Sequence, residues 1–232
     1  MEGWWLTMLK IENTEVYGWQ AAIRGMRNPM NSWDKSDSKF YVEHADCGAD
    51  DCPLSVPFIG TNDHDLMMRL AAGGSVHAKY RRMITVSCDI TAPLYWWKEF
   101  DTYKVGTVAN SCSTMHKIHA KEFTLDDFSH EHLKHDAVAV HGYSSAEVLK
   151  IIIHTLNLNR NLFLETKDKH YWHNMIQLLP TSYNQKRTVM MNYEVLVGMY
   201  RDRRNHKLDE WHTLCDWIRD LPYSEIITGG EG

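Results

Sequence analysis

Histidines are the first residues of this chain whose spacing could support chemistry. They stand in groups with short intervals between members, namely His116 and His119, then His130, His132 and His135, then His141, and finally His170 and His173. Such intervals allow imidazoles to share one helix face and ligate a metal ion. Acidic and basic residues surround the middle group, which is typical of a solvated surface. We therefore predict no metal site, and a histidine metal enzyme is the least favoured alternative.

Cys112 is a second candidate, because it lies between Ser111 and Ser113 after an aromatic stretch. A cysteine attacks only when its thiolate is stabilised, and no spacing in the sequence supplies a base for it. We therefore expect an inert thiol. No glycine-rich phosphate loop is found either, since Gly73-Gly74 and Gly229-Gly230 lack a following helix with the required lysine or serine.

Basic residues could hold a phosphate group. They fall before a predicted strand, after the aromatic stretch and at the end of a late helix: Lys79, Arg81, Arg82, Lys104, Arg201, Arg203 and Arg204. Arginine in such a place can bind a phosphate through two parallel hydrogen bonds. Most of these residues are interpreted as ordinary surface charges near helix ends.

The elements that must position these residues follow from hydrophobic periodicity and breakers. Strands are predicted over 11–19, at a sheet edge, and over 83–90, closed by Pro93. Helices are predicted over 21–27, from 61–63 to 72, over 94–103, 145–164, 168–179, 189–203 and 208–221. The inner face of the longest helix is predicted to comprise Val148, Ile151, Ile152, Thr155, Leu156 and Leu162.

Two local interpretations accompany these elements. Thr61 or Asn62 is expected to cap the second helix, with Asp63 and Asp65 complementing its dipole. Trp96 and Trp97 are interpreted as core residues, and a wall against a flat ring is the alternative.

Composition limits the class of protein. The chain has 232 residues, 44% of them hydrophobic, and a formal charge of −5, so it can bury a core and shows no basic excess for nucleic acid or an anionic membrane. Five scattered cysteines, the lack of a signal peptide and the lack of a long apolar run favour a soluble cytoplasmic protein. We expect one domain over 1–232, with a surface loop at 31–53 and a frayed tail at 228–232.

Several stretches follow one another at a specific spacing. They are Leu70 to His77, the strand to Ile90, Ala92-Pro93, the aromatic run, Thr102-Tyr103-Lys104 followed by seven residues and Cys112, and later Leu178-Leu179-Pro180, Asn192, Leu196, Arg203 and Trp211. This series, over roughly residues 60 to 220, resembles the flavin-dependent thymidylate synthases, also called thymidylate synthase complementing proteins. The signature of that family is Arg-His-Arg, seven residues, Ser.

The resemblance implies an α/β (α+β) single domain in which helices pack around a central antiparallel-type sheet. It implies a homotetramer that binds FAD and a pyrimidine nucleotide between subunits. The reaction implied is methylation of dUMP, or of a related pyrimidine nucleotide, with methylenetetrahydrofolate and NAD(P)H as co-substrates. In the family no cysteine attacks the pyrimidine, so the protein orients the flavin and polarises the base.

The resemblance also assigns roles residue by residue. The cofactor positions are His77, Thr102, Tyr103, Lys104 and Asn192, and the substrate positions are Glu99, Asn110, Ser111, Cys112 and Arg203. The catalytic positions are Tyr103, Lys104, Cys112 and Ser113. His77 matches a histidine near the flavin, Asn192 an asparagine on the flavin, and Arg203 a phosphate-binding arginine.

The signature itself departs from the family. Thr102 and Lys104 replace arginines, Tyr103 replaces the histidine, and Asn110 replaces a carboxylate. Further phosphate-holding arginines are replaced as well, by Thr114 and Ile176. Each lost charge-assisted contact removes about 2–3 kcal/mol. The alternative function is therefore a catalytically altered homologue that binds nucleotide or flavin or serves in assembly.

Overall fold

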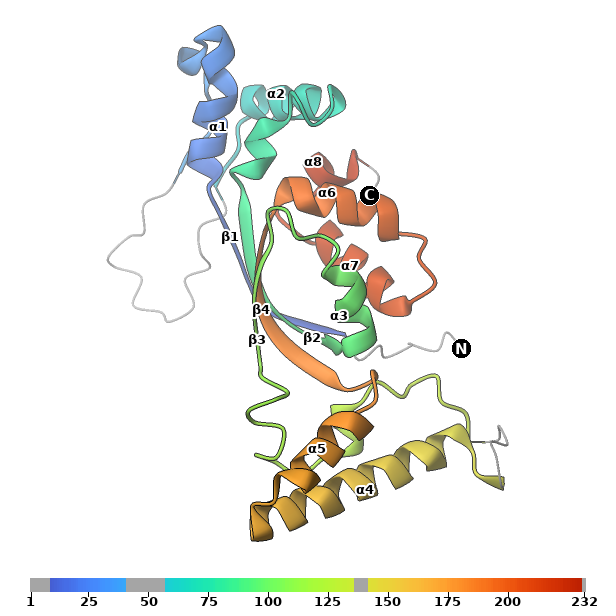
Figure 1. Ribbon diagram of the computed structural model, residues 1–232. Helices are drawn as coiled ribbons and strands as arrows, with labels where there is room; N and C mark the ends of the chain where they lie inside the picture. The colour runs from blue at the N-terminus through green and yellow to red at the C-terminus, as the bar shows by residue number, and fades with distance from the viewer. Residues whose placement is uncertain (1–8, 41–56, 136–141, 231–232) are drawn as a thin grey trace, which may run out of the picture. The chain divides into compact units, whose positions relative to one another are not determined.

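The computed structural model describes residues 9–40, 57–135 and 142–230 (Figure 1). They form a mixed α/β fold with one four-stranded antiparallel sheet, so the predicted fold class is confirmed. The strands are β1 (Lys10–Tyr17), β2 (Thr85–Pro93), β3 (Val108–Ser111) and β4 (Asn184–Asn192), in the spatial order β1-β2-β4-β3. β1 therefore lies at an edge of the sheet, as its sequence predicts.

Eight α-helices accompany this sheet in the described part of the chain. They are α1 (Trp19–Arg27), α2 (Thr61–Ala72), α3 (Leu94–Phe100), α4 (Ser145–Thr166), α5 (Lys169–Leu178), α6 (Tyr193–Arg203), α7 (Asp209–Arg219) and α8 (Glu225–Thr228). None of these helices is both long and apolar enough to cross a lipid bilayer.

Contacts between residues divide the chain into two compact units. Of the described residues, unit 1 comprises 9–10, 90–102, 110–135 and 142–187, and unit 2 comprises 11–40, 57–89, 103–109 and 188–230. β2 and β4 each contribute residues to both units. The prediction of one domain over 1–232 stays a prediction, and the units are described one at a time.

Unit 1 contains the aromatic helix α3 and the helix pair α4 and α5. Trp96 and Trp97 are 0% and 1% exposed, and the Trp97 indole nitrogen donates a hydrogen bond of 2.9 Å to the Gln185 carbonyl. Their interpretation as core residues is confirmed. A second cluster holds α4, α5 and the preceding segment together, and its buried members are Ile118, Phe123, Phe128, Leu149, Leu156 and Met175.

Unit 2 contains α1, α2, α6, α7 and α8. A buried ion pair joins α1 to α2, because Arg27 Nε donates to Asp63 Oδ1 at 2.6 Å and both side chains are almost fully buried. Near the C-terminus, the Tyr193 hydroxyl donates to the Pro222 carbonyl at 2.7 Å, and α7 contributes the fully buried Trp211. Polar contacts and apolar packing thus fix these helices together.

Three expectations about the elements are wrong. Residues 184–192 form β4, so the helix expected over 189–203 begins only at Tyr193. No strand was predicted where β3 forms, and the aromatic helix ends at Phe100 rather than at 103. The polar residues at the start of β4 obscure its alternation, in which Gln185, Val189 and Met191 are buried.

The prediction of which residues form the inner face of α4 is also partly wrong. Leu156 is buried and Ile152 packs against the core cluster, as expected, but Val148, Ile151 and Leu162 are 37%, 47% and 38% exposed. The helix is apolar on more than one face, and Leu149, Ile153 and Phe163 occupy the core side instead. Periodicity therefore identified the helix without identifying which stripe is buried.

The expected cap of α2 is replaced by a more distant residue. Gly60 occupies the N-cap position, and the Asp37 carboxylate accepts hydrogen bonds from the backbone N–H groups of Asn62 and Asp63. Residues 31–40 of the predicted surface loop are mostly exposed and include the 3₁₀ turn Trp33–Lys35, whereas 41–53 lie outside the described residues. The frayed tail predicted at 228–232 is described only up to residue 230, because 231–232 also lie outside the described residues.

Candidate functional site

Tyr103 and Arg203, both in unit 2, are in direct contact although they lie far apart in sequence. The Arg203 Nε donates a 2.9 Å hydrogen bond to the Tyr103 hydroxyl. The Arg203 guanidinium carbon lies 5.5 Å from the centre of the Tyr103 ring and 4.6 Å from that of the Trp211 ring. Two aromatic faces therefore hold the half-buried guanidinium in place. The roles that the resemblance implies for Tyr103 and Arg203 stay predictions.

Asn192 ends β4 and caps α6. Its side-chain oxygen accepts a 3.0 Å hydrogen bond from the Val195 N–H, which satisfies one free donor of the helix. Gly106 lies against the same side chain, since a Cβ at Gly106 would stand 3.0 Å from Asn192 Nδ2. This structural role accounts for the residue type, and the predicted flavin contact stays a prediction.

Two other predicted cofactor residues of unit 2 are exposed. Lys104 follows Tyr103 in the loop before β3. His77 lies in the turn after α2, where its N–H donates to the Gly74 carbonyl at 3.0 Å.

In unit 1, Cys112 and Ser113 line a polar cavity of about 270 Å³. The cavity also includes hydroxyl, amide and charged groups from β2, β4 and the segment after β3, namely Thr91, Thr114, Lys121, Asp126, Asp127, Tyr183, Asn184, Gln185 and Lys186. Two hydrogen bonds fix Cys112 beside β4: its N–H donates to Lys186, and its carbonyl accepts from Gln185 Nε2 at 2.7 Å. Cys112 and Ser113 are thus the two predicted site residues that line this cavity.

Charges in this cavity are organised around Asp127. Its carboxylate forms an ion pair with Lys121, and this contact raises the pKa of the lysine. Burial raises the pKa of Tyr183 above its usual value, and the nearby Asp127 charge adds to the increase. The Tyr183 hydroxyl therefore keeps its proton at neutral pH and is available as a hydrogen-bond donor.

Ser113 already has a structural role. Its side-chain oxygen accepts hydrogen bonds from the backbone N–H groups of Met115 and His116 at 3.2 and 2.9 Å. Such a turn holds the loop that follows Cys112. The predicted catalytic role of Ser113 is not supported by any base in contact with it among the described residues.

The remaining predicted substrate residues of unit 1 lie on β3 and α3. Asn110 and Ser111 are exposed on β3. Glu99 is half-buried in α3, and its carbonyl accepts a 2.7 Å hydrogen bond from the exposed Thr102 hydroxyl. None of these four residues lines the cavity of Cys112, so the structure does not bring the whole predicted set together.

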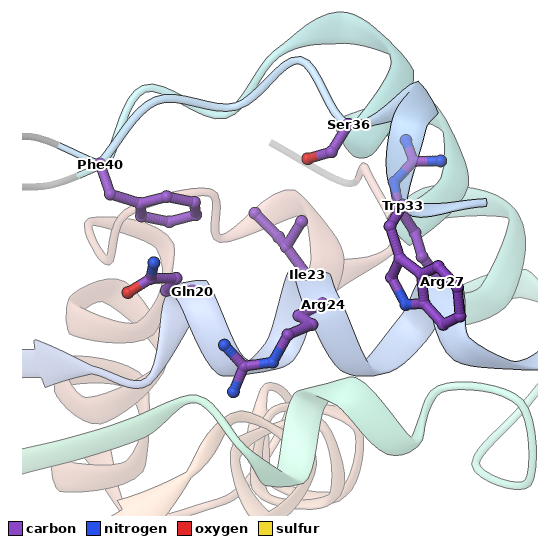
Figure 2. Close-up of a pocket in the computed structure, with 7 residues that line it drawn as sticks. All are labelled: Gln20, Ile23, Arg24, Arg27, Trp33, Ser36 and Phe40. Carbon is purple, nitrogen blue, oxygen red and sulfur yellow. The ribbon is translucent and has the colours of Figure 1, made fainter. Parts of the chain in front are cut away.

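A smaller cavity of about 190 Å³ lies in unit 2 between α1 and the segment that follows it (Figure 2). Ile23 and Phe40 give it apolar walls, while Arg24 and Arg27 supply charge. Arg27 is committed to the Asp63 carboxylate and to the Ser32 carbonyl. This cavity is accordingly interpreted as a gap left where the segment that follows α1 folds back over the helix.

The histidines do not converge on a metal site where the structure describes them. In residues 9–40, 57–135 and 142–230, no three side chains of histidine, cysteine, aspartate or glutamate are placed to hold a metal ion. His141 lies outside these ranges.

Sequence reasoning missed most of the lining of the Cys112 cavity. Lys121 and Asp127 belong to a charged segment that looks like ordinary surface, and Tyr183 precedes a strand that was not predicted. The one available signal was the alternation of Val189 and Met191, which would have identified a strand there without showing that it lies beside Cys112.

Solved structures with the same fold are enzymes of pyrimidine nucleotides. A crystal structure of the flavin-dependent thymidylate synthase ThyX from Helicobacter pylori, complexed with FAD and dUMP, has a TM-score of 0.64 and 16% identity, covering 94% of this chain and 96% of its own. Another structure of Thymidylate Synthase X from Helicobacter pylori with FAD and dUMP has a TM-score of 0.63 and 15% identity, covering 94% and 95%.

A third similar structure is the UMP/dUMP methylase PolB from Streptomyces cacaoi, bound with 5-Br dUMP. Its TM-score is 0.56 at 14% identity, with 95% of both chains covered. No protein-family model matches the chain, and no curated protein matches it by sequence. The chain therefore has the fold of the flavin-dependent thymidylate synthases, and the resemblance stated from its sequence holds at the level of the fold.

Proposed function

We propose that this chain is a flavin-dependent thymidylate synthase-like enzyme. It methylates dUMP or a related pyrimidine nucleotide such as UMP, with FAD as cofactor and methylenetetrahydrofolate and NAD(P)H as co-substrates. The observation that carries the proposal is the contact between Tyr103 and Arg203. These two residues were matched to separate parts of the family pattern, and in this fold they form one hydrogen-bonded pair.

The residues of unit 2 fit a phosphate-bearing ligand in part. Arg203 supplies a guanidinium held against the Trp211 ring. Lys104, the residue after Tyr103, supplies an exposed ammonium. We propose that Arg203 binds a nucleotide phosphate, while the Tyr103 hydroxyl keeps the guanidinium oriented. The fit is incomplete, because Thr102 cannot replace a second guanidinium.

The cavity of Cys112 in unit 1 fits the polar edge of a pyrimidine. A pyrimidine base presents both donors and acceptors, and the Tyr183 hydroxyl and the Lys121–Asp127 pair provide both kinds of group. We propose that this cavity binds and orients the base, with Cys112 as a wall rather than a nucleophile. A bound flavin would supply the redox chemistry that no side chain of this protein can perform.

The assembly and location implied by this function are also proposals. We propose a cytoplasmic homotetramer with its sites between subunits, acting on a small-molecule substrate without a nucleic-acid partner. Light scattering of the purified protein tests the assembly directly, because a monomer at micromolar concentration would exclude sites of this kind.

An absorption spectrum tests the cofactor. Purified protein should show the band of oxidised flavin at about 450 nm, or gain it when FAD is added. Conversion of dUMP or UMP in the presence of methylenetetrahydrofolate and NADPH should then be measured. Colourless protein that takes up no flavin on titration would contradict the proposal.

Arg203→Ala tests the nucleotide site, with Arg201→Ala as the matched control on the same helix. Arg201 is 72% exposed and pairs with its neighbour Asp202. We expect Arg203→Ala to weaken dUMP binding by about tenfold or more, and Arg201→Ala to change it by less than about twofold. Calorimetry with unchanged circular dichroism provides the measurement. Equal dissociation constants for the two variants would show that Arg203 does not bind the phosphate.

The second candidate function is a catalytically altered homologue that binds flavin or nucleotide, or serves in assembly, without turnover. Thr102, Thr114 and Ile176 favour it, because none of them can supply the guanidinium that the family pattern has there. Flavin and dUMP binding without product formation is the expected result. Formation of dTMP by the purified protein would exclude this candidate.

A further inference from the structure

A cavity of about 500 Å³ in unit 1 has a lining that includes none of the residues assigned above to flavin or nucleotide. It lies between the segment that follows Ser113 and the helices α4 and α5. Its volume falls within the range of about 300–1,000 Å³ that is usual for small-molecule sites.

Hydrogen bonds between elements build the walls of this cavity. The Trp172 indole nitrogen of α5 donates to the Met115 carbonyl at 3.1 Å. On the other side, Arg160 Nε of α4 donates to the His119 carbonyl at 3.1 Å. The segment from Met115 to His119 is thus tied to both helices, and the cavity is a feature of the folded unit rather than a gap beside a loop.

Aromatic rings provide its apolar surface. Phe163 packs edge-on against the His119 ring, with 4.9 Å between the ring centres. Trp172 contacts the His173 ring at the same distance. Both Phe163 and Trp172 are only partly buried although each packs against the core cluster, so part of their surface faces the cavity. A flat ring in the cavity would bury that surface.

The polar groups of the lining are cationic or neutral donors. Lys169 supplies an ammonium group, and His116, His119 and His173 supply imidazoles. The lining contains no carboxylate. The nearest acidic residue in sequence, Asp168, is occupied as the cap of α5, where its side chain accepts from the His170 N–H. The lining therefore favours an anion over a cation.

His119 adds an unusual buried group. Its Nδ1 is buried and has no hydrogen-bond partner in the described part of the chain. A buried N–H without an acceptor is costlier than a buried ring nitrogen without a proton, so this environment favours Nε2 rather than Nδ1 as the hydrogen-bond donor. The three imidazoles do not form a metal site, since no three metal-ligating side chains converge among the described residues.

We propose that this cavity binds a planar aromatic anion, with the ring against Phe163 and Trp172 and the anionic group towards Lys169 and the imidazoles. The anionic group could come from an aryl carboxylate or an aryl phosphate, which share this chemistry. The proposal goes beyond the methylase function and does not depend on it.

Three probes with the same ring test the proposal by calorimetry: naphthyl phosphate, naphthoate and the neutral naphthalenemethanol. We expect the two anions to bind with Kd below about 1 mM and the neutral probe to bind at least about tenfold more weakly. The tighter of the two anions identifies the source of the anionic group. Equal affinity for the neutral probe, or no binding by either anion, would overturn the proposal.

Lys169→Gln and His173→Gln test the anion contact, and Lys150→Gln, exposed on α4 outside the cavity, is the matched control. Either cavity variant should weaken the binding of the two anions by at least about threefold and leave the Kd of naphthalenemethanol unchanged. The two substituted residues are exposed, so the variants should fold. Unchanged anion affinity in both variants, or displacement of the bound probe by dUMP, would refute a separate anion site.

Discussion

Replacing Asp63 with asparagine tests the buried ion pair between α1 and α2. Asp63 is 0% exposed and accepts five hydrogen bonds. Arg27 binds one of its oxygens, and donors of the Ser36–Ser38 segment bind the other. An asparagine retains one acceptor oxygen, so its NH₂ group would face either the guanidinium or the serine donors.

The expected cost follows from what the substitution leaves behind. Arg27 is 4% exposed, so its charge would stay buried without a counter-ion. Breaking a buried pair in this way costs about 3–5 kcal/mol, a large part of the total stability of about 5–15 kcal/mol of an ordinary domain. Asp65→Asn, at an exposed position of the same helix, should change stability by less than about 0.5 kcal/mol.

The pH dependence provides a second measurement. Burial alone would raise the pKa of Asp63, but the hydrogen bonds from Ser38, Ser36 and Arg27 and the Arg27 charge lower it below its usual value. The contribution of Asp63 to stability is therefore complete above the unfolded-state pKa of about 3.9 and is lost as the pH falls through the lower folded-state pKa. Asp63→Asn lacks this dependence.

Urea unfolding followed by circular dichroism measures both effects. The stability difference between the wild-type protein and Asp63→Asn should be constant from neutral pH to about pH 4 and should shrink below it. A loss of less than about 1 kcal/mol at neutral pH, or a difference that grows on acidification, would refute the reasoning.

Two other predictions follow from single residues. Gly18→Ala should destabilise the protein by at least about 3 kcal/mol, because φ at Gly18 is +93° and the new Cβ would lie 1.9 Å from the Met83 carbonyl oxygen. Gly74→Ala is the control, since Gly74 also has a positive φ but has open space around it, and it should cost about 1–2 kcal/mol in the same urea titration. Iodoacetamide at pH 8 should label the exposed Cys112 and spare Cys88 and Cys215, because burial raises their thiol pKa values to about 12 and about 11; peptide mass spectrometry that finds all three equally labelled would contradict this.

Elements whose apolar residues recur at a regular period could be predicted from the sequence. The alternation of buried residues from Val86 to Ile90 identified β2, and Pro93 ends it as expected. The helical period also identified α2, α4 and α7. β4 was missed because its first half is polar, and the α4 stripe was misassigned because a helix with two apolar faces gives no local sign of which face meets the core.

The candidate site could be proposed from the sequence only through the order of matched residues. Tyr103 and Arg203 are separated by 100 positions, and nothing in composition or periodicity indicates that they meet. The partners of Cys112 in its cavity depend on the position of β4. Contacts of this range are decided by tertiary packing, so local propensity could not supply them.

The carboxylate of Asp63 also has a consequence for local motion. The backbone N–H groups of Asp37 and Ser38 both donate to it, at 3.1 and 3.0 Å, although they belong to a segment at the surface. Their hydrogens can exchange with deuterium only when these two hydrogen bonds break. The carboxylate that accepts them belongs to α2 and is paired with Arg27 of α1. The exchange rates of these two amides would therefore report how often the surface segment detaches from the buried carboxylate of α2.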